Sequence, residues 1–111
     1  MEDRITLYSL IQDDQNILIE LYFDDSGHLI FDGYDIKNII EDDPCKSPYQ
    51  CTYTIKVEEL CKLYQALDIT EGNHTEILQK LKEHFGCRNA FILMRRFMNQ
   101  YGIKFSVFAW P

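Results

Sequence analysis

The stretch ILIELYFDDSGHLIF, residues 17–31, predicts the centre of the fold. Both of its ends are rich in β-branched and aromatic residues, which favour strands. The DDSG segment between them is a short polar connection that contains a glycine, as in many β-hairpins. We therefore expect two antiparallel strands, 17–23 and 28–31, joined by a four-residue turn.

Further strands are expected on both sides of this hairpin in the sequence. Residues 5–10, 49–55 (YQCTYTI) and 103–110 (IKFSVFAW) alternate side-chain character with a period of two. That period is typical of strands that bury one face. The last of these segments must return to the sheet, because alone it could not bury its Phe residues.

Between the hairpin and the strand at 49–55, the sequence indicates turns and loops. Asp32 and Gly33 are typical turn residues and predict a turn directly after the hairpin. Asp35 is then expected to cap a short helical segment, 36–41. The prolines in 42–48 indicate an exposed loop.

The second half of the chain changes to the helical period. Apolar residues at helical spacing over 57–67 predict a first helix. Asn73 followed by Glu76 resembles a capping box, so a second helix begins there and ends at Gly86. A third helix ends at Gly102. The expected buried residues are Ile77, Leu78, Leu81 and Phe85 in the second helix, and Phe91, Met94, Phe97, Met98 and Tyr101 in the third.

The order of these elements indicates a single α+β domain over residues 1–111. Strands come first, helices follow, and one late strand closes the chain. We predict an antiparallel sheet of about four to five strands with helices packed on one face. Three helices are expected in that layer.

The charge of the chain is unevenly distributed. Its net charge is −7 at pH 7. Residues 1–55 hold twelve Asp or Glu against three Lys or Arg, a net charge of −9, whereas residues 56–111 hold six against eight, a net charge of +2. Such asymmetry bears on partners and association rates. It argues against nucleic acid as a direct partner, because binding a phosphate backbone requires Lys and Arg.

The sequence carries no recognisable catalytic or metal-binding motif. Most acids of the first half fall in predicted turns, where solvated carboxylates are favoured over a catalytic pair. The residues around Asp32 lack the ligand series of a calcium loop. The cysteines lack the short spacings of zinc sites. We therefore expect no catalytic residue, no metal and no cofactor.

The four cysteines, Cys45, Cys51, Cys61 and Cys87, are expected to be reduced. Met1 is followed at once by charged residues, so we expect no signal peptide before the domain. Thiols stay reduced in the cytoplasm, which is the expected location. No run approaches the roughly 18 apolar residues of a membrane span, so no contact with a membrane is expected.

Four segments, GHLIFDGYDIKNIIED, YQCTYTI, EELCKLYQAL and GIKFSVFAW, resemble a group of small bacterial proteins. This group is similar to the immunity proteins of polymorphic and contact-dependent growth inhibition toxin systems. The resemblance covers about residues 17–111 and rests on packing and turn signatures. Members often carry an acidic Asp-Tyr-Glu-Tyr strand, whereas this chain has Ser47-Pro48-Tyr49-Gln50-Cys51, so no toxin contact is carried over to residues 49–53.

The resemblance implies a non-enzymatic protein that neutralises one cognate toxin in the cytoplasm of the producing cell. A strongly basic toxin, such as a nuclease, would suit the acidic half of the chain. The inhibitor would occlude the active or substrate-binding surface of that toxin. The residues expected to contact it are Asp24, Asp25, Asp32, Tyr34, Asp35, Glu41, Asp42 and Asp43.

Two alternatives stay open at this point. One is a small cytoplasmic enzyme or ligand-binding protein with a site between sheet and helices that uses Cys61 or His84. The other is a subunit that associates only with itself, as a homodimer through Phe108 and Trp110.

Overall fold

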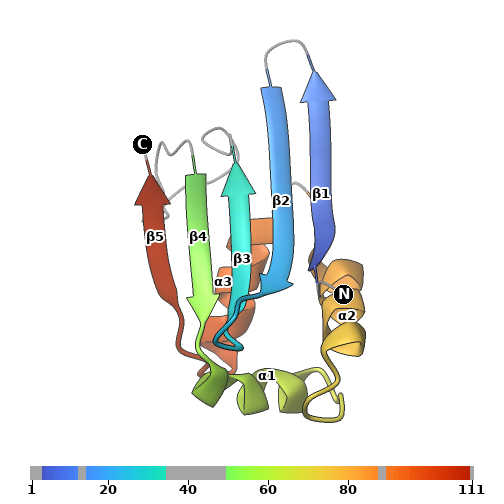
Figure 1. The fold of residues 1–111 in the computed structure, drawn as a ribbon, viewed down its shortest axis with the longest axis vertical. Coiled ribbons are helices and arrows are strands. Elements are labelled where there is room, and N and C mark those ends of the chain that lie inside the picture. The colour runs from blue at the N-terminus through green and yellow to red at the C-terminus, as the bar shows by residue number, and fades with distance from the viewer. Residues whose placement is uncertain (1–3, 13–14, 35–49, 88–89, 111) are drawn as a thin grey trace.

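The computed structural model describes residues 4–12, 15–34, 50–87 and 90–110. It contains one five-stranded sheet and three α-helices (Figure 1). The strands are β1 (Arg4–Gln12), β2 (Gln15–Phe23), β3 (Leu29–Tyr34), β4 (Gln50–Ile55) and β5 (Ser106–Trp110). The helices are the 3-10 turn η1 (Val57–Glu59), α1 (Leu60–Ala66), α2 (His74–Phe85) and α3 (Ala90–Gln100).

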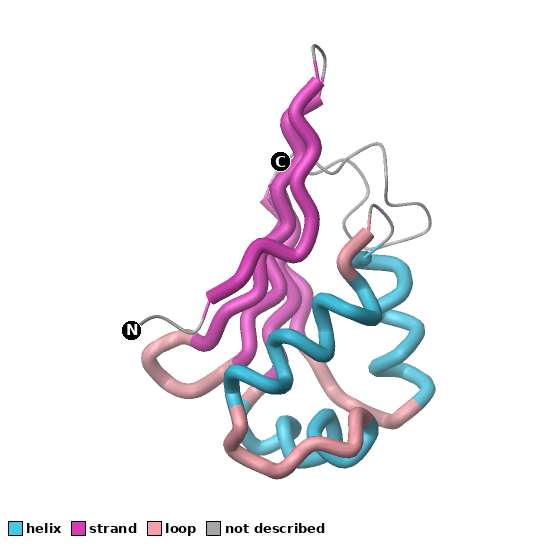
Figure 2. Tube along the Cα trace, turned by 90° about the vertical axis from the view of Figure 1, so that its right-hand side faces the viewer, coloured by secondary structure: helices cyan, strands magenta, loops and turns pink. Residues whose placement is uncertain are grey.

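Neighbouring strands in the sheet are also neighbours in the sequence. The order is β1-β2-β3-β4-β5, and each adjacent pair is antiparallel. The connection from β4 to β5 contains all of the described helices. These helices lie on one side of the sheet (Figure 2). The predicted α+β fold, with an antiparallel sheet and three helices on one face, is confirmed.

The centre of the core, between the sheet and the helices, is aromatic. Phe31 of β3 lies opposite Tyr53 of β4. Both rings meet the ring of Phe91 in α3 edge-on, with centroids 4.6 Å and 4.9 Å away respectively. All three side chains are buried. Edge-on aromatic pairs contribute roughly 0.5–1.5 kcal/mol beyond the area that they bury, so this cluster fixes α3 over the middle of the sheet.

The turn predicted at Asp32 and Gly33 does not exist. Both residues lie inside β3, where Asp32 pairs with Glu20 on one side and Thr52 on the other. Pairing on both sides supplies partners for the backbone of β3. This pairing overrides the local preference of an Asp-Gly sequence for a turn.

The turn predicted between the two hairpin strands is confirmed. Asp24 Oδ1 accepts hydrogen bonds from the backbone N–H groups of Ser26 and His28, each at 2.9 Å. Gly27 has φ +83°, a backbone conformation that favours glycine. The Asp24 carboxylate is therefore part of the turn itself.

Two residues expected on buried helix faces are exposed. The predicted helix over 57–67 is a 3-10 turn followed by α1, so Val57 lies outside the α-helix and is 52% exposed. Tyr101 follows the last residue of α3 and is 47% exposed. In both cases the helix predicted from the sequence is longer than the α-helix in the structure.

The start of α2 is as predicted. The Asn73 side chain accepts a hydrogen bond from the Glu76 backbone N–H at 3.1 Å and donates one to the Glu76 carboxylate at 2.9 Å. At the other end, a Cβ on Gly86 would lie 2.5 Å from the Lys82 carbonyl oxygen and 3.1 Å from that of Leu7. Glycine therefore lets β1 approach the end of α2. The predicted buried residues of α2, Ile77, Leu78, Leu81 and Phe85, are confirmed.

The described cysteines differ in oxidation state. Cys51 is buried and disulfide-bonded, whereas Cys61 and Cys87 are free and partly buried. The expectation that all cysteines are reduced is therefore wrong for Cys51. Disulfides are uncommon in the reducing cytoplasm.

Helix α3 ends in a Schellman motif. The N–H of Ile103 donates to the Met98 carbonyl at 2.8 Å, and that of Gly102 donates to the Asn99 carbonyl at 3.4 Å. Gly102 has φ +67°, as this motif requires after the helix.

Helix α1 ends in the same pattern, but with an aspartate in the left-handed position. The N–H of Ile69 donates to the Tyr64 carbonyl at 2.9 Å, and that of Asp68 donates to Gln65 at 3.2 Å. Asp68 has φ +57°. A residue with a Cβ adopts this conformation at a cost of roughly 1–2 kcal/mol, somewhat less for Asp.

We predict that Asp68→Gly stabilises the protein. Glycine removes the cost of the left-handed backbone, which raises the free energy of unfolding by about 0.5–1 kcal/mol. Urea denaturation measures this change. The matched variant is Gly102→Ala, which adds a Cβ to the equivalent position of α3 and should destabilise by a similar amount. The same sign for the two changes would contradict this account of the helix ends.

Candidate functional site on the helix-free face of the sheet

One face of the sheet is not covered by any described helix (Figure 2). A single row of residues crosses this face from β1 to β5: Thr6, Glu20, Asp32, Thr52 and Phe108. Neighbouring positions on the same face hold Tyr22, Tyr34 and Gln50, because side chains alternate along each strand. We call this surface the helix-free face.

Asp32 is the centre of a hydrogen-bond network on the helix-free face. Its side chain accepts hydrogen bonds from the Thr52 hydroxyl at 2.7 Å, the Gln50 amide at 2.9 Å and the Tyr34 hydroxyl at 3.0 Å. Asp32 is only 4% exposed, although no described helix covers it. All three donors are neutral, so the network supplies hydrogen bonds to the carboxylate without a neutralising charge.

Two phenols of this face have a raised pKa. Burial, the hydrogen bond to Asp32 and the charge of Asp32 together raise the pKa of Tyr34 to about 12. Burial and the charge of Asp32 also raise the pKa of Tyr22, while the charge of Arg4 opposes the shift. Both hydroxyl groups therefore stay protonated to a higher pH than those of ordinary tyrosines.

Arg4 shows that this face accommodates a guanidinium group. Its Nη1 lies 3.1 Å from Glu20 Oε1, and its Cζ lies 4.1 Å from the centroid of the Tyr22 ring. A carboxylate beside an aromatic ring binds a guanidinium through charge, hydrogen bonding and cation–π attraction. The Arg4 side chain is 41% exposed, so this arrangement lies at the surface.

The structure brings together only part of the predicted contact region. Asp32 and Tyr34 are hydrogen-bonded neighbours on the helix-free face. Asp24 and Asp25 lie instead in the turn between β2 and β3, where Asp25 is exposed and the Asp24 carboxylate binds backbone N–H groups. The remaining predicted residues, Asp35, Glu41, Asp42 and Asp43, lie outside the described residues.

Several residues of this face were not singled out from the sequence: Arg4, Glu20, Tyr22, Gln50 and Thr52. A signal for three of them was present. Glu20 and Tyr22 alternate with the apolar residues of β2, and Thr52 alternates with those of β4. Alternation of this kind predicts the face opposite the core.

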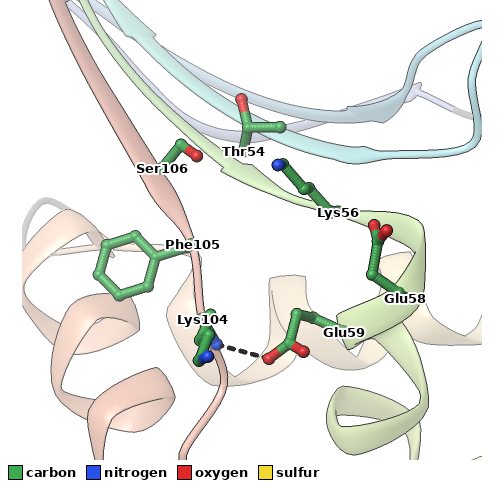
Figure 3. A pocket seen from close by; sticks show the side chains of 7 residues that line it. All are labelled: Thr54, Lys56, Glu58, Glu59, Lys104, Phe105 and Ser106. Carbon is green, nitrogen blue, oxygen red and sulfur yellow. Dashed lines mark hydrogen bonds between the residues drawn. The ribbon is translucent and has the colours of Figure 1, made fainter.

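A second candidate is a hollow of about 350 Å³ between η1 and the start of β5 (Figure 3). Its lining mixes both signs of charge: Thr54, Lys56, Glu58, Glu59, Lys104, Phe105 and Ser106. Glu59 Oε1 accepts hydrogen bonds from the Lys104 backbone N–H and from Lys62 Nζ, each at 2.9 Å. The Glu59 carboxylate therefore joins α1 to the segment that leads into β5.

The residues proposed for an enzyme site do not line this hollow. Cys61 lies on α1 and is partly buried, and its Sγ is 3.9 Å from the Glu58 carbonyl oxygen. His84 is exposed on α2. Among the described residues, no three His, Cys, Asp or Glu side chains form a group that could hold a metal ion. No helix in the described ranges is both long and apolar enough to cross a membrane.

We predict that Asp32→Asn lowers the pKa of Tyr34. The change removes the negative charge of Asp32 and replaces the carboxylate by an amide oxygen, which is a weaker hydrogen-bond acceptor. Burial, the largest cause of the shift, remains. The pKa should therefore fall from about 12 but stay above 10. NMR titration of ring-labelled tyrosine measures it, with Tyr34→Phe to assign the signal. In the parent protein, the raised pKa of Tyr34 stabilises the fold at pH values below the ordinary tyrosine pKa of 10.0. This contribution is lost as the pH rises through about 12. An unchanged Tyr34 titration would contradict the network.

We also predict that Glu59 makes the fold sensitive to acid. The Lys104 N–H and the Lys62 ammonium lower the pKa of the Glu59 carboxyl. Its stabilising contribution is therefore present above the ordinary Glu pKa, about 4.3, and is lost as pH falls through the lower folded value. Urea midpoints between neutral and acidic pH should decline less steeply in Glu59→Gln than in the parent. Glu83→Gln, an exposed change on α2, is the control and should follow the parent.

Comparison with protein-family models found no match for the chain. Comparisons with curated proteins and with solved structures also found none.

Proposed function

We propose that the protein is an immunity protein, without enzymatic activity, that neutralises a basic toxin by covering its active or substrate-binding surface. The observation that supports this most is the helix-free face with Asp32 at its centre. The face is built on paired strands, and its polar groups are held by hydrogen bonds before any partner arrives. A surface held in its bound conformation loses little entropy on association.

The residue types of this face suit a protein partner. Tyrosines are enriched where proteins dock, and carboxylates set charge complementarity and association rate. Tyr22 and Tyr34 flank Asp32, and Glu20 lies directly opposite Asp32 on β2. The contact of Arg4 with Glu20 and Tyr22 illustrates how the arginine side chains of a basic partner would be bound by a carboxylate beside an aromatic ring.

The charge of the chain supports a basic partner. A net charge of −7 attracts a cationic protein from a distance and repels nucleic acid. A toxin that cleaves nucleic acid would carry the complementary charge, because it must hold phosphate. The cytoplasm of the producing cell is the location in which such an inhibitor would meet its toxin.

The test must leave the Asp32 network intact, because reversing a buried carboxylate would unfold the protein rather than report on binding. Glu20→Gln with Asp25→Asn removes two carboxylates, one from the helix-free face and one from the adjoining turn. The matched control, Glu71→Gln with Glu83→Gln, removes two exposed carboxylates from the α2 region. Both variants have the same net charge.

We predict that the first variant slows association with the product of the neighbouring gene by several-fold and weakens the dependence of this association on salt, whereas the control does so much less. The reason is that charges at an interface steer the encounter more than distant charges do. Stopped-flow association at several salt concentrations measures this difference. Equal rates for the two variants would refute the helix-free face as the contact surface, and absence of any complex would refute the proposed function.

A further inference from the structure

We propose that the hollow between η1 and the start of β5 binds a small zwitterion, a molecule that carries one oxyanion group and one ammonium group. The hollow measures about 350 Å³ (Figure 3). This volume lies at the lower end of the range for small-molecule sites in proteins. The inference does not depend on the proposed function. It rests on the charges that line the hollow and on the contacts that hold its walls.

The walls of the hollow are held by contacts between elements that are distant in sequence. Thr54, near the end of β4, lies opposite Ser106 at the start of β5. On the other side, the Glu59 carboxylate accepts hydrogen bonds from the Lys104 backbone N–H and from Lys62 Nζ, each at 2.9 Å. These bonds join η1 to the segment that leads into β5. A site that is formed before its ligand arrives loses less entropy on binding.

Two side chains of opposite charge line the hollow, Lys56 directly before η1 and Glu58 within it. Both are exposed, and neither forms an ion pair with the other or with another residue in the described part of the chain. Glu59 differs, because Lys62 already compensates its charge. The hollow therefore presents a cation and an anion to any molecule that enters it.

The directions of the side chains give each charge a separate place in the hollow. Figure 3 shows the Lys56 ammonium and the Ser106 hydroxyl pointing toward each other, with the Glu58 carboxylate beside η1. An ammonium and a hydroxyl that converge are hydrogen-bond donors for an oxyanion, either a carboxylate or a phosphate. The Glu58 carboxylate is an acceptor for an ammonium group.

The nearness of the two charges favours a zwitterion over a ligand with a single charge. An anion that binds Lys56 also approaches Glu58, and the like charge opposes its binding. A cation that binds Glu58 approaches Lys56 and is opposed in the same way. A zwitterion meets both side chains with the opposite charge. Because exposed ion pairs contribute little individually, we expect weak but saturable binding.

NMR titration of the isotope-labelled full chain tests the proposal with three probes that share one carbon chain. γ-Aminobutyrate carries both charges, butyrate only the negative charge and butylammonium only the positive charge. The backbone amide signals of Lys56, Glu58 and Ser106 should shift and saturate with γ-aminobutyrate, at concentrations several-fold lower than the other two probes require. Titration with O-phosphoethanolamine shows whether phosphate or carboxylate is the preferred oxyanion. Equal affinities for the three probes, or no saturation with either zwitterion, would overturn the proposal.

Two single variants test the part played by each charge. Lys56→Gln should lower the preference for γ-aminobutyrate over butylammonium, and Glu58→Gln should lower its preference over butyrate. The matched controls, Lys82→Gln and Glu83→Gln, are exposed changes on α2 and should keep both preferences.

Unchanged preferences in the Lys56 and Glu58 variants would show that the probes bind elsewhere and would overturn the assignment. Neither change removes a partner of the Glu59 carboxylate, so the walls of the hollow stay intact. The rate at which Glu20→Gln with Asp25→Asn associates with the toxin has no bearing on these titrations. The two proposals can therefore fail separately.

Discussion

Strand β3 is paired on both sides, and this double pairing fixes the direction of every side chain in the middle of the sheet. Phe31 lies opposite Leu21 and Tyr53, and the next residue, Asp32, lies opposite Glu20 and Thr52. A shift of one residue would turn Asp32 into the aromatic core and Phe31 toward solvent. The packing of α3 and the network around Asp32 therefore depend on the same register.

The sequence was sufficient for the elements whose signals are local. Alternation over 49–55 predicted the buried face of β4, and the pair Asn73 and Glu76 predicted the start of α2. It was insufficient where tertiary pairing opposes a local preference. Asp32 and Gly33 look like a turn, and only the strands on both sides of β3 make them part of a strand.

The candidate site could be predicted in part for the same reason. Asp32 and Tyr34 stand out by charge and aromatic character, and their hydrogen bond spans only two residues of sequence. Gln50 and Thr52 reach the same carboxylate from 18 and 20 residues away. Such partners follow from strand register, which a single sequence does not specify. Charge alone does not distinguish the acids of the turn, Asp24 and Asp25, from Asp32. The structure places the Asp32 carboxylate inside the sheet, where strand pairing fixes its direction.

The long connection between β4 and β5 determines the order in which the sheet can be completed. Strands β1 to β4 are joined in sequence and can pair as soon as they leave the ribosome, whereas β5 is separated from β4 by every described helix. Local contacts form faster than contacts across a long loop. During synthesis, β4 is therefore the temporary boundary of the sheet until β5 has left the ribosome.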